Sequence, residues 1–275
     1  MKYLRISLAA LALFAAFFNA NAQQHTHLHV DPEWSECSFH LDSSLTQNAF
    51  HKFTGEAGLV TYFRPLTDAK PMGVGNVELS MLQWNSWIDE NSEQWNNTFV
   101  HPDSTHWLID GPKLPFPGFM LRTGISKRMD AGVYWTFRPG ANYGFFGGQL
   151  QYNFFNDEEK GWAAAARGSF MSLYGPKDIS YQVYGLDVLA SRKIKLYSNW
   201  LSLSPYVTAS SLFTRSHEKS NLVDLHNEFR VGAQASAGAV LQVSIFRVGI
   251  DYNFSRVNTI SYKIGLAYNF NKSTR

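Results

Sequence analysis

One stretch near the end of the sequence constrains the fold more than any other. Over the twelve positions from Thr259 to Phe270, even-numbered residues are apolar or aromatic and odd-numbered residues are small or polar. This alternation predicts one β-strand, because successive side chains of a strand point to opposite faces. A soluble antiparallel sheet shows the same alternation. Aromatic residues near the strand end, opposite a face of Gly, Ser, Asn and Lys, favour a transmembrane barrel.

The same stretch carries the short motif Lys263-x-Gly265-x-x-Tyr268-x-Phe270. It resembles the C-terminal β-signal of Gram-negative outer-membrane β-barrel proteins, which places a polar residue, a glycine and two aromatic residues at this spacing. The resemblance implies two partners: the outer-membrane lipid bilayer and the machinery that assembles proteins into it. The sequence departs from the pattern in one respect. Residues 271–275 form a short tail after Phe270, whereas many such proteins stop at the aromatic residue.

Residues 1–22 have the composition of a secretory signal peptide. Lys2 and Arg5 precede an apolar run, and Ala20-Asn21-Ala22 forms a small-x-small cleavage site. The run is too short to span a bilayer as a helix. Removing the signal peptide removes two of the 24 Lys and Arg residues, which leaves 22 of them against 22 Asp and Glu. A neutral mature chain does not predict a nucleic-acid partner.

Beyond the signal peptide, two features restrict how an exported chain of this kind is stabilised. Cys37 is the only cysteine, so no internal disulfide is predicted. No later apolar run approaches the roughly 20 residues of a membrane helix. A membrane location therefore requires a closed barrel, because lipid leaves backbone groups no other way to form hydrogen bonds. No cofactor is predicted.

Alternating strand patterns extend over residues 73–270 and predict an all-β, up-and-down antiparallel transmembrane barrel. We expect about ten strands, with eight to twelve possible. The longest predicted connections, 85–118 and 214–224, fall on the same side of the barrel as 139–143 and 174–180. Outer-membrane barrels place their long loops outside the cell. Both chain termini are accordingly expected in the periplasm.

Residues 23–72 precede the barrel, and apolar residues at helical spacing predict a helix near 44–62. Gly55 and Gly58 weaken that helix, and Arg64-Pro65 should end it. This segment either plugs the lumen or lies in the periplasm across the barrel mouth. The layout is similar to that of long-chain fatty-acid and aromatic-compound transporters, although those barrels are larger and no binding residues are carried over.

Charged residues of both signs fall on the face predicted to line the lumen. They either fill the lumen with ion pairs or form a charged path for solutes. A barrel of about ten strands is narrow, since side chains alone fill one of about eight strands. The predicted lining residues are Glu78, Arg122, Arg138, Arg167, Asp187, Glu228, Arg230, Arg247, Asp251 and Lys263.

The predicted loop 85–118 is rich in tryptophan. Trp84 and Trp87 suit the membrane interface, where such rings gather, whereas Trp95 and Trp107 are candidates for stacking on a ligand. The run from His101 to His106, with Ser104, holds catalytic residue types, but no motif of a known outer-membrane enzyme accompanies it.

His25, His27 and His29 alternate near the expected mature N-terminus, so they share one side of an extended chain. Such imidazoles are a candidate metal site; a polar export tail is the plainer interpretation.

Three functions remain open on this evidence. The first is a passive channel for small solutes, including hydrophobic ones. The second is a barrel that transports nothing and anchors or presents the 85–118 loop for binding. The third, less favoured, is a lipid-active outer-membrane enzyme.

Overall fold

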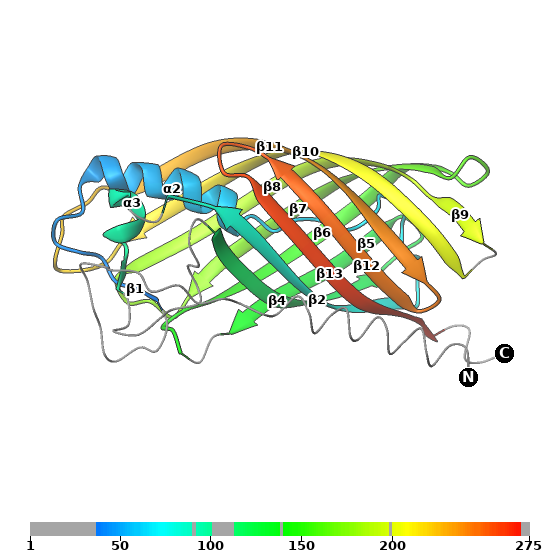
Figure 1. Ribbon diagram of the computed structural model, residues 1–275, viewed down its shortest axis with the longest axis horizontal. Coiled ribbons are helices and arrows are strands. Elements are labelled where there is room, and N and C mark those ends of the chain that lie inside the picture. The colour runs from blue at the N-terminus through cyan, green and yellow to red at the C-terminus, as the bar shows by residue number, and fades with distance from the viewer. Residues whose placement is uncertain (1–36, 90–91, 101–112, 138–139, 198–199, 271–275) are drawn as a thin grey trace.

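The computed structural model describes residues 37–89, 92–100, 113–137, 140–197 and 200–270. Ten long strands form one closed antiparallel barrel, in which each strand pairs with the next and the last pairs with the first (Figure 1). The predicted all-β, up-and-down barrel of ten strands is confirmed. The strands are β2 (Asn76–Trp87), β4 (Lys113–Gly124), β5 (Met129–Phe137), β6 (Gly144–Asp157), β7 (Trp162–Tyr174), β8 (Ile179–Arg192), β10 (Leu201–Glu218), β11 (Glu228–Val243), β12 (Phe246–Phe254) and β13 (Thr259–Asn269).

The two ends of the barrel differ. At one end, here named the loop end, the 88–112 connection carries α3 (Glu93–Asn96) and β3 (Phe99–Val100). There β3 pairs with β1 (Ser38–Phe39), outside the barrel sheet. The opposite end, here named the turn end, has short connections such as 125–128 and 244–245, and the four-residue strand β9 (Ile194–Tyr197) extends it beside β10 (Figure 1).

Two strands extend further than their sequence patterns predicted. β4 begins at Lys113 although Pro117 lies in it. The recorded β4–β5 register starts only at Phe119↔Trp135, so Pro117 occupies a part of β4 bonded to β2 alone. An edge position tolerates proline, which has no N–H to donate to a second neighbour.

β10 likewise continues to Glu218, so the connection after it is 219–227 rather than 214–224. Thr214 and Ser216 are polar but buried and inward-facing, and their polarity resembled that of a loop.

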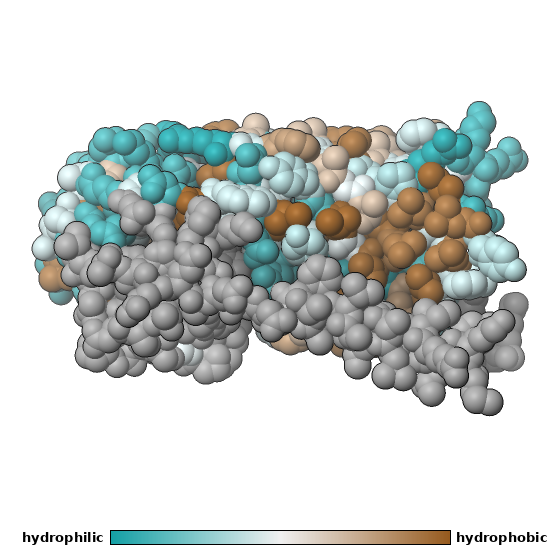
Figure 2. All heavy atoms as spheres, viewed as in Figure 1, coloured by the Kyte–Doolittle hydropathy of each residue, from teal (hydrophilic) through white to brown (hydrophobic). Residues whose placement is uncertain are grey.

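The outer wall of the barrel is apolar, as the alternation predicted. Leu79, Trp135 and Leu186 are 51%, 40% and 61% exposed, although each lies in the middle of a strand. Hydrophobic residues gather over the barrel wall in Figure 2, and hydrophilic residues gather at its ends. None of the helices in the described ranges has the length and apolar character needed to span a membrane.

Candidate functional site: the filled lumen

The lumen is occupied by the segment that precedes the first barrel strand. Helix α2 (Gln47–Thr61) starts at the loop end and runs into the barrel, and residues 62–75 continue to the turn end, where β2 begins (Figure 1). Every residue from 57 to 69 is buried. Thr46 caps the helix by accepting a hydrogen bond from the Ala49 amide, the cap position being typical of threonine. We name residues 47–75 the lumen segment.

Helix α2 is fitted closely to the wall. Thr54 Oγ1 donates to Ser216 Oγ at 2.9 Å, and Thr61 Oγ1 donates to the Tyr181 hydroxyl at 3.1 Å. A Cβ on Gly58 would collide with the side chain of Thr214. The glycine that weakens the helix is therefore the residue that allows α2 to approach β10.

The loop-end half of the lumen is apolar. An aromatic cluster, defined as Phe39, Phe53, Trp95, Phe99 and Tyr143, joins α2 to α3, β1 and β3. Ring centroids lie 4.4 Å apart for Phe39 and Phe99, and 5.2 Å apart for Phe53 and Trp95. Pairs at these separations favour edge-to-face or offset geometry and add to the stabilisation from burial. Packed aromatic rings therefore occupy this half of the lumen.

Inward positions of the neighbouring wall strands are apolar as well, which corrects the expectation of a polar inner face throughout. Trp84 is 1% exposed and points inward under the Arg64 guanidinium, 5.6 Å from the ring centre, so it does not belong to an interface belt. Phe116, Met120 and Tyr134 also face inward and are buried.

The turn-end half is charged. Glu78 lies on β2 between two cations: Lys263 Nζ at 2.7 Å and an Arg247 nitrogen at 3.1 Å. Arg247 also contacts Asp68 of the lumen segment at 3.2 Å. One arginine therefore joins an anion of the wall to an anion of the segment.

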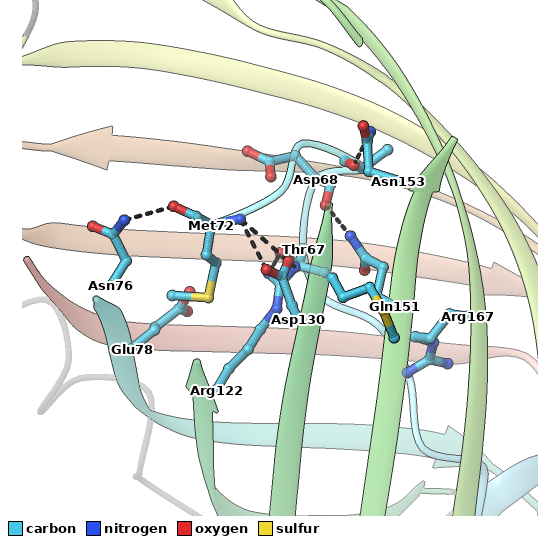
Figure 3. A network of polar contacts seen from close by, with 12 residues as sticks. Thr67, Asp68, Met72, Asn76, Glu78, Arg122, Asp130, Gln151, Asn153 and Arg167 are labelled. Carbon is cyan, nitrogen blue, oxygen red and sulfur yellow. Dashed lines mark hydrogen bonds and ion pairs between the residues drawn. The ribbon is translucent and has the colours of Figure 1, made fainter. Parts of the chain in front are cut away.

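A second arginine makes the same kind of link beside it. Arg122 contacts Asp130 at 2.6 Å and donates to the hydroxyl of Thr67 in the lumen segment. Asp130 in turn accepts from the backbone amide of Met72 at 3.0 Å (Figure 3). The carboxylate of Asp130 is thus shared between the wall and the segment, which fixes where the segment leaves the lumen.

A third arginine lies at mid-height. Arg167 pairs with Asp187 at 2.6 Å and donates a hydrogen bond to Gln149 Oε1 at 2.8 Å. It also donates to the carbonyl oxygen of Phe63, while the Tyr62 hydroxyl donates to Asp187. Gly185 leaves the space for the Tyr62 ring, since a Cβ there would collide with it.

The buried charges balance within this half of the described structure. The wall contributes four cations and four anions, and residues 62–75 contribute one of each, Arg64 and Asp68; Glu56 of α2, near the cap, pairs with the exposed Arg256. A filled, neutral interior avoids the cost of an unpaired buried charge. The wall residues are Arg122, Arg167, Arg247 and Lys263 against Glu78, Asp130, Asp187 and Asp251.

Seven of the predicted lining residues are in that balanced set. Glu228 and Arg230 lie nearer the loop end on β11 and are half-buried; Glu228 contacts His51 Nδ1 at 2.7 Å and accepts from Gln47. Asp251 is buried on β12, beside the side-chain hydroxyls of Ser236 and Tyr206 on neighbouring strands. Arg138 lies outside the described residues.

Three contributors to the network were missed from sequence. Asp130 is the second residue of β5, which begins at Met129 and turns the carboxylate inward. Arg64 and Asp68 belong to the lumen segment, where no periodic pattern marks a residue as facing a wall. The only available signal was their charge in an otherwise apolar and proline-containing stretch.

The residues of the C-terminal motif divide between the two faces of β13. Lys263 points inward to Glu78, and Gly265 lies against Ser80. Tyr268 and Phe270 are exposed on the outer face, with ring centroids 4.9 Å apart. The Phe270 amide donates to the Gly75 carbonyl at 2.9 Å, joining the end of β13 to the start of β2.

The predicted ligand-stacking residue Trp95 is buried, and its rings are already in contact with Phe53 and Phe99. Its Nε1 donates to Glu56 of α2 at 2.8 Å. A ligand from solvent cannot stack on the Trp95 ring in this arrangement, because the side chains packed around the ring cover it. Trp107 lies outside the described residues.

The remaining candidates also fall outside the described ranges: His25, His27 and His29 before residue 37, and His101, Ser104 and His106 within 101–112. Within the described ranges, no group of three or more His, Cys, Asp or Glu side chains is placed to hold a metal ion.

Comparison with protein-family models finds no match. No curated protein sequence matches either. Solved structures similar to this chain include Ail of Yersinia pestis, at 15% identity and a TM-score of 0.32, covering 71% of this chain and 99% of that one. The β domain of the Bordetella autotransporter BrkA is 12% identical, with a TM-score of 0.39, covering 72% and 100%.

An outer membrane channel from Pseudomonas putida F1 is 10% identical, with a TM-score of 0.39, covering 75% of this chain and all of that one. Likenesses of this degree assign no function and no residue role to this chain.

Proposed function

We propose that this protein is an integral outer-membrane barrel that forms a passive channel for small solutes, and that the lumen segment closes it. The channel opens when the lumen segment moves. Residues 1–22 direct export, the Lys263–Phe270 motif directs assembly, and the turn end faces the periplasm.

The outer wall supports the membrane location. Its exposed apolar side chains lie mid-strand, where a soluble protein would cover them with a second layer. All ten barrel strands have at least nine residues, and a tilted strand needs about 9–11 residues to cross a bilayer. A closed ring also leaves no unpaired strand edge in lipid.

The charge balance of the wall carries the channel proposal. The wall's four buried cations and four buried anions balance without the lumen segment. Withdrawal of the segment therefore leaves no net charge in the barrel. An insert that takes no part in the hydrogen bonding of the barrel sheet, and whose removal leaves the wall neutral, is suited to moving.

Conductance tests the proposal directly. The full mature chain and a variant lacking residues 37–72 are reconstituted in planar bilayers, after heat-modifiable migration on gels shows that both barrels have folded. We expect steady ohmic conductance from the shortened barrel and a closed state from the full chain. A folded, shortened barrel that passes no current would refute the channel.

A single substitution tests the same point in the full chain. Gly185→Val places a side chain where the Tyr62 ring lies, so it should displace the lumen segment and raise the frequency of open events. Gly168→Val is the matched control, because Gly168 faces outward on the adjacent strand and a Cβ there meets only Leu186, at 4.0 Å. Equal open frequencies in the two variants would count against gating by the segment.

The cap at the loop end favours presentation of a binding surface as the second candidate. The β1–β3 pair, α3 and the start of α2 are joined through the aromatic cluster into one body rather than separate loops. Deleting residues 101–111 should then abolish partner binding while the barrel still folds. A lipid-active enzyme would require lipolysis that is lost in His106→Ala or Ser104→Ala.

A further inference from the structure

Neutral polar side chains form a patch on the inner face of the wall. Strands β10–β13 carry these side chains at inward positions, where none of them is more than 7% exposed. We name this surface the polar patch; its members are Tyr206, Thr208, Gln234, Ser236, Asn253 and Ser261. The patch offers hydroxyl and amide groups and carries no ammonium, guanidinium or carboxylate group of its own.

Strand register places these side chains next to one another. Ser236 lies directly opposite Thr208 on one side and opposite Asn253 on the other. Gly238 lies opposite Tyr206, and a Cβ on Gly238 would collide with the Tyr206 ring. Opposite residues of an antiparallel pair have Cβ atoms about 4.5–5.5 Å apart. The patch is therefore one continuous surface, in which the tyrosine ring covers the space beside the glycine.

The patch has hydrogen-bonding capacity that the protein does not use. Within the described ranges, the side-chain oxygens of Thr208, Gln234, Asn253 and Ser261 have no hydrogen-bond partner. Buried polar groups are nearly always bonded to protein or to water. Amide oxygens only accept, whereas hydroxyl groups both donate and accept. A molecule with several hydroxyl groups can satisfy both kinds of group at once.

Charged groups of the wall offer a solute much less. Arg167 is already paired with Asp187 at 2.6 Å. Asp251 adjoins the polar patch, but it lies beside the hydroxyl groups of Ser236 and Tyr206. The buried cations and anions of the wall are equal in number. A charged solute therefore meets no net attraction in the barrel, whereas an uncharged solute meets the unused hydrogen-bonding groups of the patch.

The lumen segment lies beside the patch in the closed arrangement. Arg64 donates to Thr259 Oγ1 at 2.9 Å, and Thr259 lies opposite Asn253. Ser261 follows Thr259 on the same face of β13, because alternate residues of a strand share a face. The Arg64 guanidinium also donates to the Leu59 carbonyl at 2.8 Å, near the end of α2. Arg64 is therefore held to the helix, and withdrawal of the segment uncovers this side of the patch.

We infer that the polar patch is the solute-binding surface of the channel and that it selects small, uncharged solutes with several hydroxyl groups, such as short polyols. Hydroxyl groups of the solute take the place of water and exchange hydrogen bonds with the oxygens of the patch. The inference rests on the proposed channel function and names the class of solute for it.

Uptake of three matched solutes into proteoliposomes tests the inference. Sorbitol, gluconate and N-methylglucamine share a polyhydroxy chain and are neutral, anionic and cationic, respectively. The full mature chain carrying Gly185→Val is used, because this substitution is expected to open the channel. We expect sorbitol to enter fastest. Equal entry of the three solutes, or faster entry of either charged solute, would overturn the inference.

A substitution within the patch gives a second measurement. Asn253→Leu in the same background removes an acceptor at nearly constant volume, and sorbitol entry should fall about fivefold, as the loss of one neutral hydrogen bond predicts. Asn85→Leu is the matched control and should leave sorbitol entry unchanged, because Asn85 faces outward on β2 and accepts from Gln83. Equal entry in the two variants would contradict the inference. If Asn253→Leu does not assemble, Ser261→Ala, which removes only a hydroxyl group, takes its place.

The channel and its solute class fail in different ways. Conductance without any preference for sorbitol would leave the channel standing and remove the role of the patch. A Gly185→Val chain that conducts no more than the parent would remove gating by the lumen segment, and the solute class would fall with it.

Discussion

The two halves of the lumen are built from different chemistry on the same wall. In the loop-end half, α2 packs through the aromatic cluster, in which Phe53 meets Trp95 and Phe39. In the turn-end half, residues 62–75 contact the wall through arginines and carboxylates. Burial of apolar surface is favourable by about 25 cal/mol per Å². A buried ion pair recovers little more than the cost of removing its charges from water.

This difference indicates which part of the lumen segment moves most easily. The contacts of residues 62–75 with Arg122, Arg167 and Arg247 are polar, and water that enters the lumen can replace them. Contacts of α2 are apolar, and exposing them to water is costly. Displacement is therefore expected to begin at the turn end and to proceed toward the helix, with the loop-end cap remaining in place longest.

The largest expected effect comes from breaking the mid-height ion pair. Arg167→Met leaves Asp187 buried without its cation and removes the bonds to Gln149 and to Phe63. Loss of one member of a buried pair costs about 3–5 kcal/mol. Urea-induced unfolding of the barrel in lipid vesicles measures the free energy of unfolding against that of the parent.

A double variant separates the unpaired charge from the lost packing. Arg167→Met with Asp187→Leu removes both charges, and it should recover most of the stability that Arg167→Met loses. Failure of the double variant to recover stability would show that the turn-end half is held by packing and hydrogen bonds, as the loop-end half is. The contrast between the halves would then be lost.

The next effect belongs to the aromatic cluster. Phe53 is 1% exposed and its ring meets Trp95 edge-on. Phe53→Ala removes that ring and leaves a cavity, with an expected cost of about 3 kcal/mol, at the lower end for such truncations. Leu222→Ala, in the exposed 219–227 connection, is the control and should change the free energy of unfolding little.

Conductance distinguishes the two halves further. If the lumen segment loosens first at the turn end, Arg167→Met should raise the frequency of open events more than Phe53→Ala does. The comparison is made per unit of free energy of unfolding that each variant loses. The reverse order would mean that α2 leaves first.

The wall could be predicted from the sequence because alternation is a local property. Leu79, Leu121 and Leu186 point outward in the phase that their strands set, and Glu78, Arg122 and Asp187 point inward. Where a strand pattern was masked by proline or by consecutive polar residues, as at Pro117 and Thr214, the strand ends were misplaced.

The contents of the lumen could not be predicted in the same way. Trp84 has the same alternation phase whether it faces an interface or an arginine, so its position depends on Arg64, 20 positions earlier in the chain. Residues 62–75 have no regular period, and their partners Asp130 and Arg247 come from distant strands. The helix could be predicted from its spacing, whereas plug and flap were both open because neither leaves a local pattern.

The smallest effect tests whether the loop-end half contains a polar contact that matters. Trp95→Phe keeps an aromatic ring between Phe53 and Phe99 but removes the Nε1 donor to Glu56, which is 2.8 Å away. The expected cost is about 1–2 kcal/mol, because a largely buried carboxylate loses one donor. Arg256, 3.5 Å from the other Glu56 oxygen, is 67% exposed, so Arg256→Gln should cost under about 1 kcal/mol. Equal losses in the two variants would mean that Glu56 is held by its surface partner and that packing alone secures α2 to α3. A larger loss in Trp95→Phe would place one directional bond within the apolar half, where it fixes the register of α2 against the cap.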